Sequence, residues 1–197
     1  MKSVVLFFIL LLPFTGSCQL LDSLSLDTIT PYTSIQAAML DSSNVIKLDL
    51  SKQKLSSFPD NIRKFINLQY LDLSKNKISQ IPAWIGELKN LQYLILSHNK
   101  IDSLPDQFGD LANLRYFIMN RSELRALPHS IGKLKELRYM DLWGDNLSYF
   151  PQELKYLSAL QSLDLRDVQM NTAMQERLKT LLPNATIYFS PPCACEQ

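Results

Sequence analysis

The sequence predicts an α/β solenoid, in which similar coils stack and each coil contributes one strand to a curved, parallel β-sheet. Three observations lead to this fold class. Six segments repeat at a constant spacing of 23 residues, beginning at Val45, Leu68, Leu91, Leu114, Leu137 and Leu160. Apolar and polar residues alternate near the start of each segment, as at Leu71 and Leu73, which is the period of a half-buried strand. Prolines recur at the same spacing, at Pro59, Pro82, Pro105, Pro128 and Pro151.

The strand segments supply the front layer of the core. A single short strand cannot bury its inward side chains, whereas stacked coils let each strand pair with the next one at about 4.8 Å. We therefore expect the inward strand residues to be buried, namely Leu71, Leu73, Leu94, Leu96 and Leu142.

The second half of each coil returns on the opposite side of the core. Proline fixes its own φ and disfavours a helical residue before it, so each proline ends the turn after the strand and starts the return. The back layer of the core is then supplied by Ile85, Leu88, Phe108, Leu111, Ile131 and Leu134.

The repeat resembles the leucine-rich repeat family, in its 23-residue class with Leu-Pro in the second half of the unit. The segment Leu68–Ile78 matches Leu91–Ile101, and the resemblance covers residues 45–182. It implies a solenoid with the sheet on its concave face, an irregular or short-helical convex side, and an asparagine ladder that contains Asn76 and Asn99. Other residues stand at the ladder position in the remaining coils, so we expect repeats four to six to be less regular. These replacements are Gln53, Ser122, Asp145 and Val168.

Both open ends of such a solenoid need a cap. At the N-terminal end, Thr33 or Ser34 can act as the N-cap of a short helix. At the C-terminal end, residues 171–182 form an amphipathic helix and residues 185–189 can add a last strand.

The predicted organisation is one domain, residues 32–190, between two shorter segments. The domain comprises an N-terminal cap, five full repeats, and a sixth repeat with the C-terminal cap, over residues 32–44, 45–159 and 160–190. Residues 19–31 form either a tether or an edge segment, and residues 191–197 form a tail.

Residues 1–18 have the features of an export signal. Lys2 gives a positive start, and the apolar run Val4–Leu12 is too short to anchor the chain by spanning a membrane. The stretch Thr15–Cys18 resembles a relaxed bacterial lipobox, which implies lipidation of Cys18, although the family prefers Leu where Thr15 stands. The alternative is ordinary cleavage near Cys18 and free secretion. We therefore expect an exported protein, either an outer-membrane or periplasmic lipoprotein or a secreted one.

Charge and residue types exclude several function classes. The formal net charge is +1, with 20 basic and 19 acidic residues, so we do not expect nucleic acid as a partner. We expect contact with a membrane only through the N-terminal lipid anchor. No phosphate-binding glycine loop, nucleophile elbow or His-Glu-x-x-His motif occurs, and His98 and His129 belong to different surfaces of the coil. Cys193 and Cys195 have no further ligands near them in sequence. We expect no catalysis, no metal site and no cofactor.

The outward strand positions predict a binding surface on the concave face. The third position of the unit gives a column of four tyrosines, and the fifth is Asp in four units but Ile in two. Isoleucines exposed beside tyrosines and a tryptophan are costly in water, and Tyr, Trp and Arg dominate binding hot spots. Stacked tyrosines also stabilise adjacent strands, which is the alternative explanation for that column. The predicted contact residues are Tyr93, Ile95, His98, Tyr116, Ile118, Arg121, Tyr139 and Trp143, rimmed by Asp72 and Asp141.

These features predict a recognition module at the cell envelope, with a protein as the expected partner. Two alternatives remain. One is a structural, self-associating envelope protein, and the other is a protein that binds a cell-wall or sugar fragment. A distinctive concave surface favours a specific partner, and a uniform polar one would favour the structural role.

Overall fold

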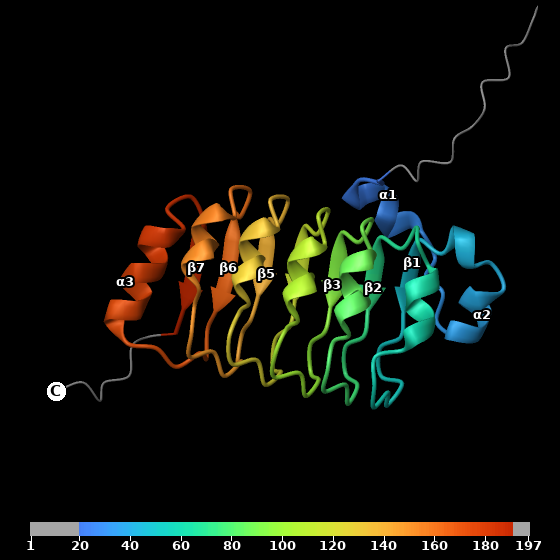
Figure 1. The fold of residues 1–197 in the computed structure, drawn as a ribbon, viewed down its shortest axis with the longest axis horizontal. Helices are drawn as coiled ribbons and strands as arrows, with labels where there is room; N and C mark the ends of the chain where they lie inside the picture. The colour runs from blue at the N-terminus through green and yellow to red at the C-terminus, as the bar shows by residue number, and fades with distance from the viewer. Residues whose placement is uncertain (1–19, 191–197) are drawn as a thin grey trace, which may run out of the picture.

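A computed structural model describes residues 20–190 of the 197-residue chain, and these residues form a curved solenoid (Figure 1). Seven strands make one sheet in the order of the chain, and every neighbouring pair is parallel. The strands are β1 (Lys47–Asp49), β2 (Tyr70–Asp72), β3 (Tyr93–Ile95), β4 (Tyr116–Ile118), β5 (Tyr139–Asp141), β6 (Ser162–Leu165) and β7 (Thr186–Phe189).

The sheet register follows the 23-residue spacing. Tyr70 pairs with Tyr93 and Leu71 with Leu94, so equivalent residues of successive coils stand side by side. The middle residue of each strand points inward, and the predicted inward leucines are all fully buried, which confirms their assignment. They are Leu71, Leu73, Leu94, Leu96 and Leu142.

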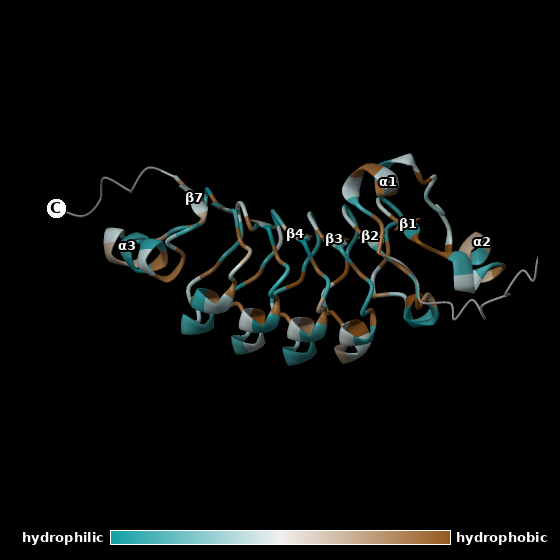
Figure 2. Cartoon of the chain, turned by 90° about the horizontal axis from the view of Figure 1, so that it is seen from above, coloured by the Kyte–Doolittle hydropathy of each residue, from teal (hydrophilic) through white to brown (hydrophobic). Residues whose placement is uncertain are grey.

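The convex side carries one short 3-10 turn per coil. Each turn begins directly after a repeat proline. The ring of that proline fixes its φ near −70° at the residue that precedes the turn. Figure 2 shows these turns on one side of the solenoid and the strands on the other, with the core between them. The turns are η2 (Asp60–Lys64), η3 (Ala83–Glu87), η4 (Asp106–Asp110), η5 (His129–Lys133) and η6 (Gln152–Tyr156).

Helices close both ends of the stack, as the sequence predicts. At the N-terminal end, α2 (Ile35–Met39) has Ser34 as its N-cap, whose side chain accepts a hydrogen bond from the Ala37 amide, and η1 (Ser42–Asn44) leads into β1. At the C-terminal end, α3 (Thr172–Leu181) buries Leu178 against the last coil. Among residues 20–190, no helix is long and apolar enough to cross a bilayer.

The asparagine ladder is present in the first coils. The Asn76 amide nitrogen donates to the carbonyl oxygens of Leu50 and Leu73, both at 2.9 Å, and its oxygen accepts from the amides of Gln53 and Leu55. The sheet keeps its one-to-one register through β4, β5 and β6 although the ladder asparagine is absent there, so the expected loss of regularity does not reach the strands.

A second asparagine series, which the sequence analysis did not identify, joins the turns that precede the strands. Asn67 donates to the carbonyl of Ser43, Asn90 to that of Ile66, and Asn113 to that of Lys89, at 2.6–2.9 Å. These bonds stack successive coils at the edge where the strands start.

Candidate binding surface

A continuous column of tyrosine rings crosses the concave face. The rings of Tyr93 and Tyr116 lie parallel, with centroids 4.3 Å apart and an interplanar angle of 7°. Tyr70 and Tyr139 extend the column on either side, at 5.8 and 6.4 Å from their neighbours. Burial, followed by the charge of nearby carboxylates such as Asp72, raises the pKa of Tyr70 to about 12. The Tyr70 phenol is therefore neutral at physiological pH.

The column of aspartates beside the tyrosines stabilises the ends of the strands. In each of its four members, one carboxylate oxygen accepts a hydrogen bond from the backbone amide two residues later, at 2.7–3.1 Å. The carboxylates that cap a strand end in this way belong to Asp49, Asp72, Asp141 and Asp164. The predicted rim residues Asp72 and Asp141 thus serve the fold, whatever else they contact.

Two isoleucines interrupt this column at its centre. Ile95 and Ile118 are paired neighbours in β3 and β4, flanked in register by Asp72 on one side and Asp141 on the other. An isoleucine offers no oxygen to the strand-end amide, and the Asn120 amide instead donates to the hydroxyl of Ser97 at 3.3 Å. Both isoleucine side chains are half-buried, so they are less accessible to solvent than the sequence analysis predicts. The fold gains no capping bond from these two residues.

A tryptophan and an arginine are held rigidly beside the isoleucines. The Arg121 guanidinium stacks on the Trp143 ring at 4.2 Å from the centroid, within the range of a cation–π contact. The indole nitrogen of Trp143 donates to Asp167 at 2.8 Å. Contacts on two sides fix the rotamer of Trp143, so the ring is preorganised for contact with a partner.

A helix that the sequence did not predict covers the N-terminal part of the concave face. Residues 19–31 could have been a tether or an edge segment; within them, α1 (Ser23–Thr28) buries Leu26 to 1% exposure. The Leu26 carbonyl accepts a hydrogen bond from Lys47, a residue of β1. The backbone of Leu21 is held by two buried glutamine side chains, Gln69 and Gln92. Figure 2 shows α1 on the strand side of the solenoid, near β1 and β2.

The predicted contact residues therefore lie on one surface, part of which α1 reaches. Tyr93 contacts Ser23 and lies near Asp27, both in α1. His98 and Arg121 are exposed, both at positive φ just after their strands, and the tyrosines, isoleucines and Trp143 are half-buried. Ser97 and Asp164, which also belong to the outward positions of the repeat, are buried, each with 6% exposure.

The C-terminal margin of this surface carries a tight ion pair. Arg166 contacts both carboxylate oxygens of Asp164, with its closest nitrogen at 2.6 Å. Burial alone would raise the pKa of Asp164, but hydrogen bonds from Arg166 hold it below its ordinary value. The Arg166 guanidinium also lies 5.9 Å from the ring centre of Tyr188 in β7.

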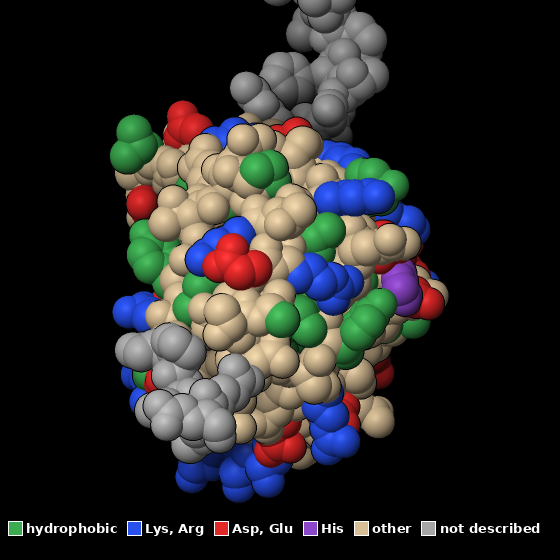
Figure 3. Space-filling view, turned by 90° about the vertical axis from the view of Figure 1, so that its left-hand side faces the viewer, with side chains coloured by type: hydrophobic (Ala, Val, Ile, Leu, Met, Phe, Trp, Pro, Cys, Tyr) green, Lys and Arg blue, Asp and Glu red, His purple; other side chains and the backbone are tan. Residues whose placement is uncertain are grey.

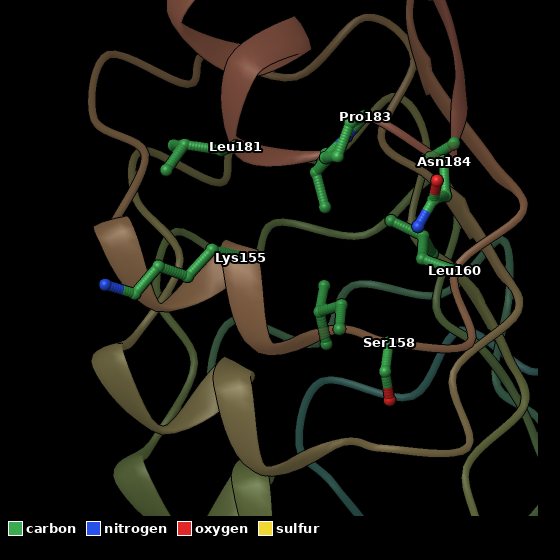
Figure 4. A pocket seen from close by; sticks show the side chains of 9 residues that line it. Lys155, Ser158, Leu160, Leu181, Pro183 and Asn184 are labelled. Atoms are coloured by element: carbon green, nitrogen blue, oxygen red, sulfur yellow. The ribbon is translucent and has the colours of Figure 1, made fainter.

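A small cavity lies where the C-terminal cap meets the last coil. A cavity of about 200 Å³ lies between η6 and the end of α3, lined by Lys155, Ser158, Leu160, Leu181, Pro183 and Asn184 among others (Figure 4). Known ligand pockets occupy about 300–1,000 Å³, so this space is a packing gap at the cap junction. Within residues 20–190, no group of three or more His, Cys, Asp or Glu side chains is placed to hold a metal ion.

Comparison with known proteins decides the family. A family model described as a leucine-rich repeat region matches residues 23–185 of this chain. The chain is a leucine-rich-repeat protein. The family and the similar structures described below support a protein-interaction module in general terms. No curated protein sequence matches the chain.

Two solved structures of bacterial proteins are similar in fold to this leucine-rich-repeat protein. A leucine-rich-repeat protein of Leptospira interrogans is 29% identical over 83% of this chain, with a TM-score of 0.66. An internalin C2 of Listeria monocytogenes is 22% identical over 75% of this chain, with a TM-score of 0.61, and shows likeness of fold alone. The chain spans 47% of the Leptospira protein and 62% of the internalin, so it is shorter than either.

Proposed function

We propose that this protein is a recognition module exported to the cell envelope, which binds a protein partner on its concave face. The observation that carries the proposal is the replacement of aspartate by Ile95 and Ile118 at the centre of the sheet. Each replacement gives up a strand-end hydrogen bond and places an apolar side chain beside Tyr93 and Tyr116. Because each replacement gives up a hydrogen bond, an increase in the stability of the fold does not explain it. Contact of the isoleucines with a partner does explain it.

The neighbours of the isoleucines support a specific partner. Trp143 and Arg121 form a fixed stack, and Tyr116 and Tyr139 stand next to them in the sheet. Tyr, Trp and Arg are the residue types that dominate binding hot spots, and rigid anchors lose little entropy on binding. The proposed contact residues remain Tyr93, Ile95, His98, Tyr116, Ile118, Arg121, Tyr139 and Trp143, with Asp72 and Asp141 at the rim.

The other two functions have less support. Self-association by end-to-end stacking would need a continuous apolar end, but hydrophobic side chains at the C-terminal end lie among charged ones (Figure 3). A sugar-fragment site would need a concave pocket, and the larger convex cavity of about 570 Å³ lies between η5 and η6, away from the aromatic column.

Attachment to the envelope is the second part of the proposal. The support is the sequence of residues 1–18, with its positive start, apolar run and lipobox-like Thr15–Cys18, all of which lie outside the described residues. Lipidation of Cys18 with more than one acyl chain would anchor the protein stably. Mass spectrometry of the mature N-terminus tests this part, because an unmodified start at Gln19 would contradict it.

The binding proposal is tested by the double variant Ile118→Asp with Trp143→Ala. Asp at position 118 is the residue the repeat uses elsewhere, and it can accept the bond from the Asn120 amide, so we expect the fold to survive. Partners captured from an envelope extract would be identified and then titrated against purified protein. Loss of two hot-spot contacts should weaken affinity at least about tenfold.

A matched control is Lys77→Ala with Lys100→Ala, two exposed residues outside the predicted surface. We expect this control to bind like the parent chain. Unchanged affinity of the double variant for an identified partner, with its circular dichroism intact, would contradict concave-face binding.

A further inference from the structure

One edge of the solenoid has a distinct charge. We define the strand-start edge as the six equivalent segments that precede the strands: residues 40–46, 63–69, 86–92, 109–115, 132–138 and 155–161. These segments contain eight basic and four acidic side chains, although the whole chain has a formal net charge of only +1. The excess of positive charge on this edge is therefore offset by acidic residues elsewhere.

The basic side chains of this edge keep most of their charge. Lys64 and Arg138 are exposed, and among residues 20–190 no carboxylate lies within ion-pair distance of either. Lys89 and Lys135 donate to backbone carbonyls, of Asp110 and Tyr156. A carbonyl does not neutralise an ammonium group, so these lysines still present positive charge to the solvent. Arg63 and Lys133, by contrast, are paired with Glu87 and Asp110.

The start of the described chain docks at this same edge. The Leu21 amide donates to the Gln69 side chain, and the Leu21 carbonyl accepts from Gln92, at 2.9 and 2.8 Å. Gln69 and Gln92 are the last residues before β2 and β3. Only two residues, Gln19 and Leu20, lie between Leu21 and Cys18, and the three residue steps span at most about 10 Å. An anchor attached at Cys18 would therefore hold this edge close to the membrane.

Apolar side chains are exposed near this docking point. Ile66 is 66% exposed in the turn before β2, and its carbonyl takes part in the asparagine series of this edge. Leu24 in α1 and Leu40 at the end of α2 are 78% and 90% exposed, at the same end of the molecule. Exposed aliphatic side chains next to basic ones are the composition that enters the headgroup region of a bilayer.

We propose that the strand-start edge rests on an anionic bilayer surface, with Lys64, Lys89, Lys135 and Arg138 facing the lipid phosphates and Ile66 entering the headgroup region. This inference rests on the proposed anchor at Cys18. The charge complementarity of the edge and the short stretch of chain between Cys18 and Leu21 carry it. Basic residues close to an anchor are attracted to acidic lipids, and the attraction weakens with salt.

This orientation leaves the concave face open. The strand-start edge is the upper edge in Figure 1, where α1 lies, and Figure 2 looks onto it from above. The strands run away from this edge and the 3-10 turns lead back to it, so the sheet would stand upright on the membrane. A partner could then reach Trp143 and Ile118 from the side.

The test uses the full chain, expressed in a bacterium, purified in detergent and reconstituted into vesicles. Neutral vesicles contain phosphatidylcholine alone, and anionic ones contain phosphatidylcholine with phosphatidylglycerol. Hydrogen exchange of backbone amides is followed by mass spectrometry. We expect exchange in residues 63–69 and 132–138 to slow several-fold on anionic vesicles compared with neutral ones, and the slowing to disappear in high salt.

The charge-reversal variant Lys64→Glu with Arg138→Glu should abolish this slowing. The control Lys77→Glu with Lys100→Glu makes the same charge change after the strands and should leave it unchanged. Equal exchange on both kinds of vesicle, equal slowing before and after the strands, or a chain that joins neither kind of vesicle would each overturn the proposal. Partner titration in detergent is unaffected by these outcomes, so failure here is distinguishable from failure of concave-face binding.

Discussion

Asp145 offers a test of how the ladder position works without its asparagine. One carboxylate oxygen of Asp145 accepts a hydrogen bond from the Ser122 amide at 2.9 Å, as the oxygen of Asn76 does for Gln53. The other oxygen is buried and has no hydrogen-bond partner in the described part of the chain. It occupies the place of the amide nitrogen, which in Asn76 donates to two carbonyl oxygens.

A charged carboxylate is unfavourable in this place, because an oxygen anion would face carbonyl oxygens of the neighbouring turns. Burial raises the pKa of Asp145 from its ordinary value of 3.8 to about 7, although the amides of Ser122 and Leu124 act in the opposite direction. A protonated carboxyl can donate one hydrogen bond and so imitates the asparagine.

The sign of the pH dependence follows from the raised pKa. The folded chain holds the Asp145 proton up to a pH of about 7, whereas the unfolded chain loses it near 3.8. The stabilising contribution is therefore complete below 3.8 and is lost as the pH rises through about 7. At about 1.4 kcal/mol for each pKa unit, the loss between these two pH values is ~4 kcal/mol as an upper bound.

Asp145→Asn removes the titration and restores both amide donors. We expect the free energy of unfolding of this variant to exceed that of the parent by about 2–4 kcal/mol near pH 8 and by much less near pH 4. Urea unfolding followed by circular dichroism at a series of pH values measures the difference. Comparison of variant and parent at each pH cancels the carboxylates they share, including Asp164, whose pKa is lowered and whose contribution runs in the opposite direction.

Asp102→Asn is the matched control, since it removes one carboxylate at an exposed position. It should change stability little at any pH. A gain for Asp145→Asn that is the same at pH 4 and pH 8, or a loss at pH 8, would refute the reasoning. Either result would mean that the carboxylate of Asp145 is well solvated or paired in its charged form.

Three further substitutions test the packing. Leu94→Ala should cost about 2–5 kcal/mol in urea unfolding, and a cost below about 1 kcal/mol would show that the strand register is wrong. Gly109→Ala should cost about 1–3 kcal/mol, because a Cβ there would collide with the backbone carbonyl of Ser130; an unchanged unfolding midpoint would contradict the close approach of η4 and η5. Leu26→Asp should release α1, so amide exchange in residues 22–29 should become fast while β3 to β5 stay protected, and slow exchange in α1 would show that Leu26 does not hold it.

The sequence alone predicts the structure of each coil, because the same pattern of inward apolar residues recurs in every repeat. The spacing of 23 residues determines which residues pair across the sheet, so the sequence alone places Tyr93 and Tyr116 side by side. The caps were also predictable, since Ser34 and the amphipathic stretch before Pro183 are local signals. The division of the domain into caps and repeats, and its partner site, remain predictions.

The parts that were not predicted depend on contacts between distant residues. Leu24 and Leu26 alternate with serines as in a strand, and nothing local indicates that α1 folds back over β1. The signal that could have indicated it is the pair Gln69 and Gln92, polar residues that are fully buried just before their strands. Similarly, the sequence shows the aspartate column only as polar residues at outward positions. Their hydrogen bonds to strand-end amides depend on the backbone geometry and could not be predicted from the sequence.

The extent of the open surface limits the kind of partner that fits it. α1 occupies the concave face near β1 and β2, which leaves the strands from β3 to β6. Three strand spacings of about 4.8 Å and strand segments of about 15–20 Å, including the residues just after each strand, give a face of only about 200–300 Å². A stable interface of standard size buries about 800 Å² on each partner. A partner that binds through this surface must therefore be either a single inserted segment or a larger protein that also contacts the loops beyond His98 and Arg121, where Lys100, Glu123 and Arg125 are exposed. Amide exchange in the complex separates the two, because a segment should protect β3 to β6 and the residues just after them, and a larger partner should also protect residues 100–104 and 123–127.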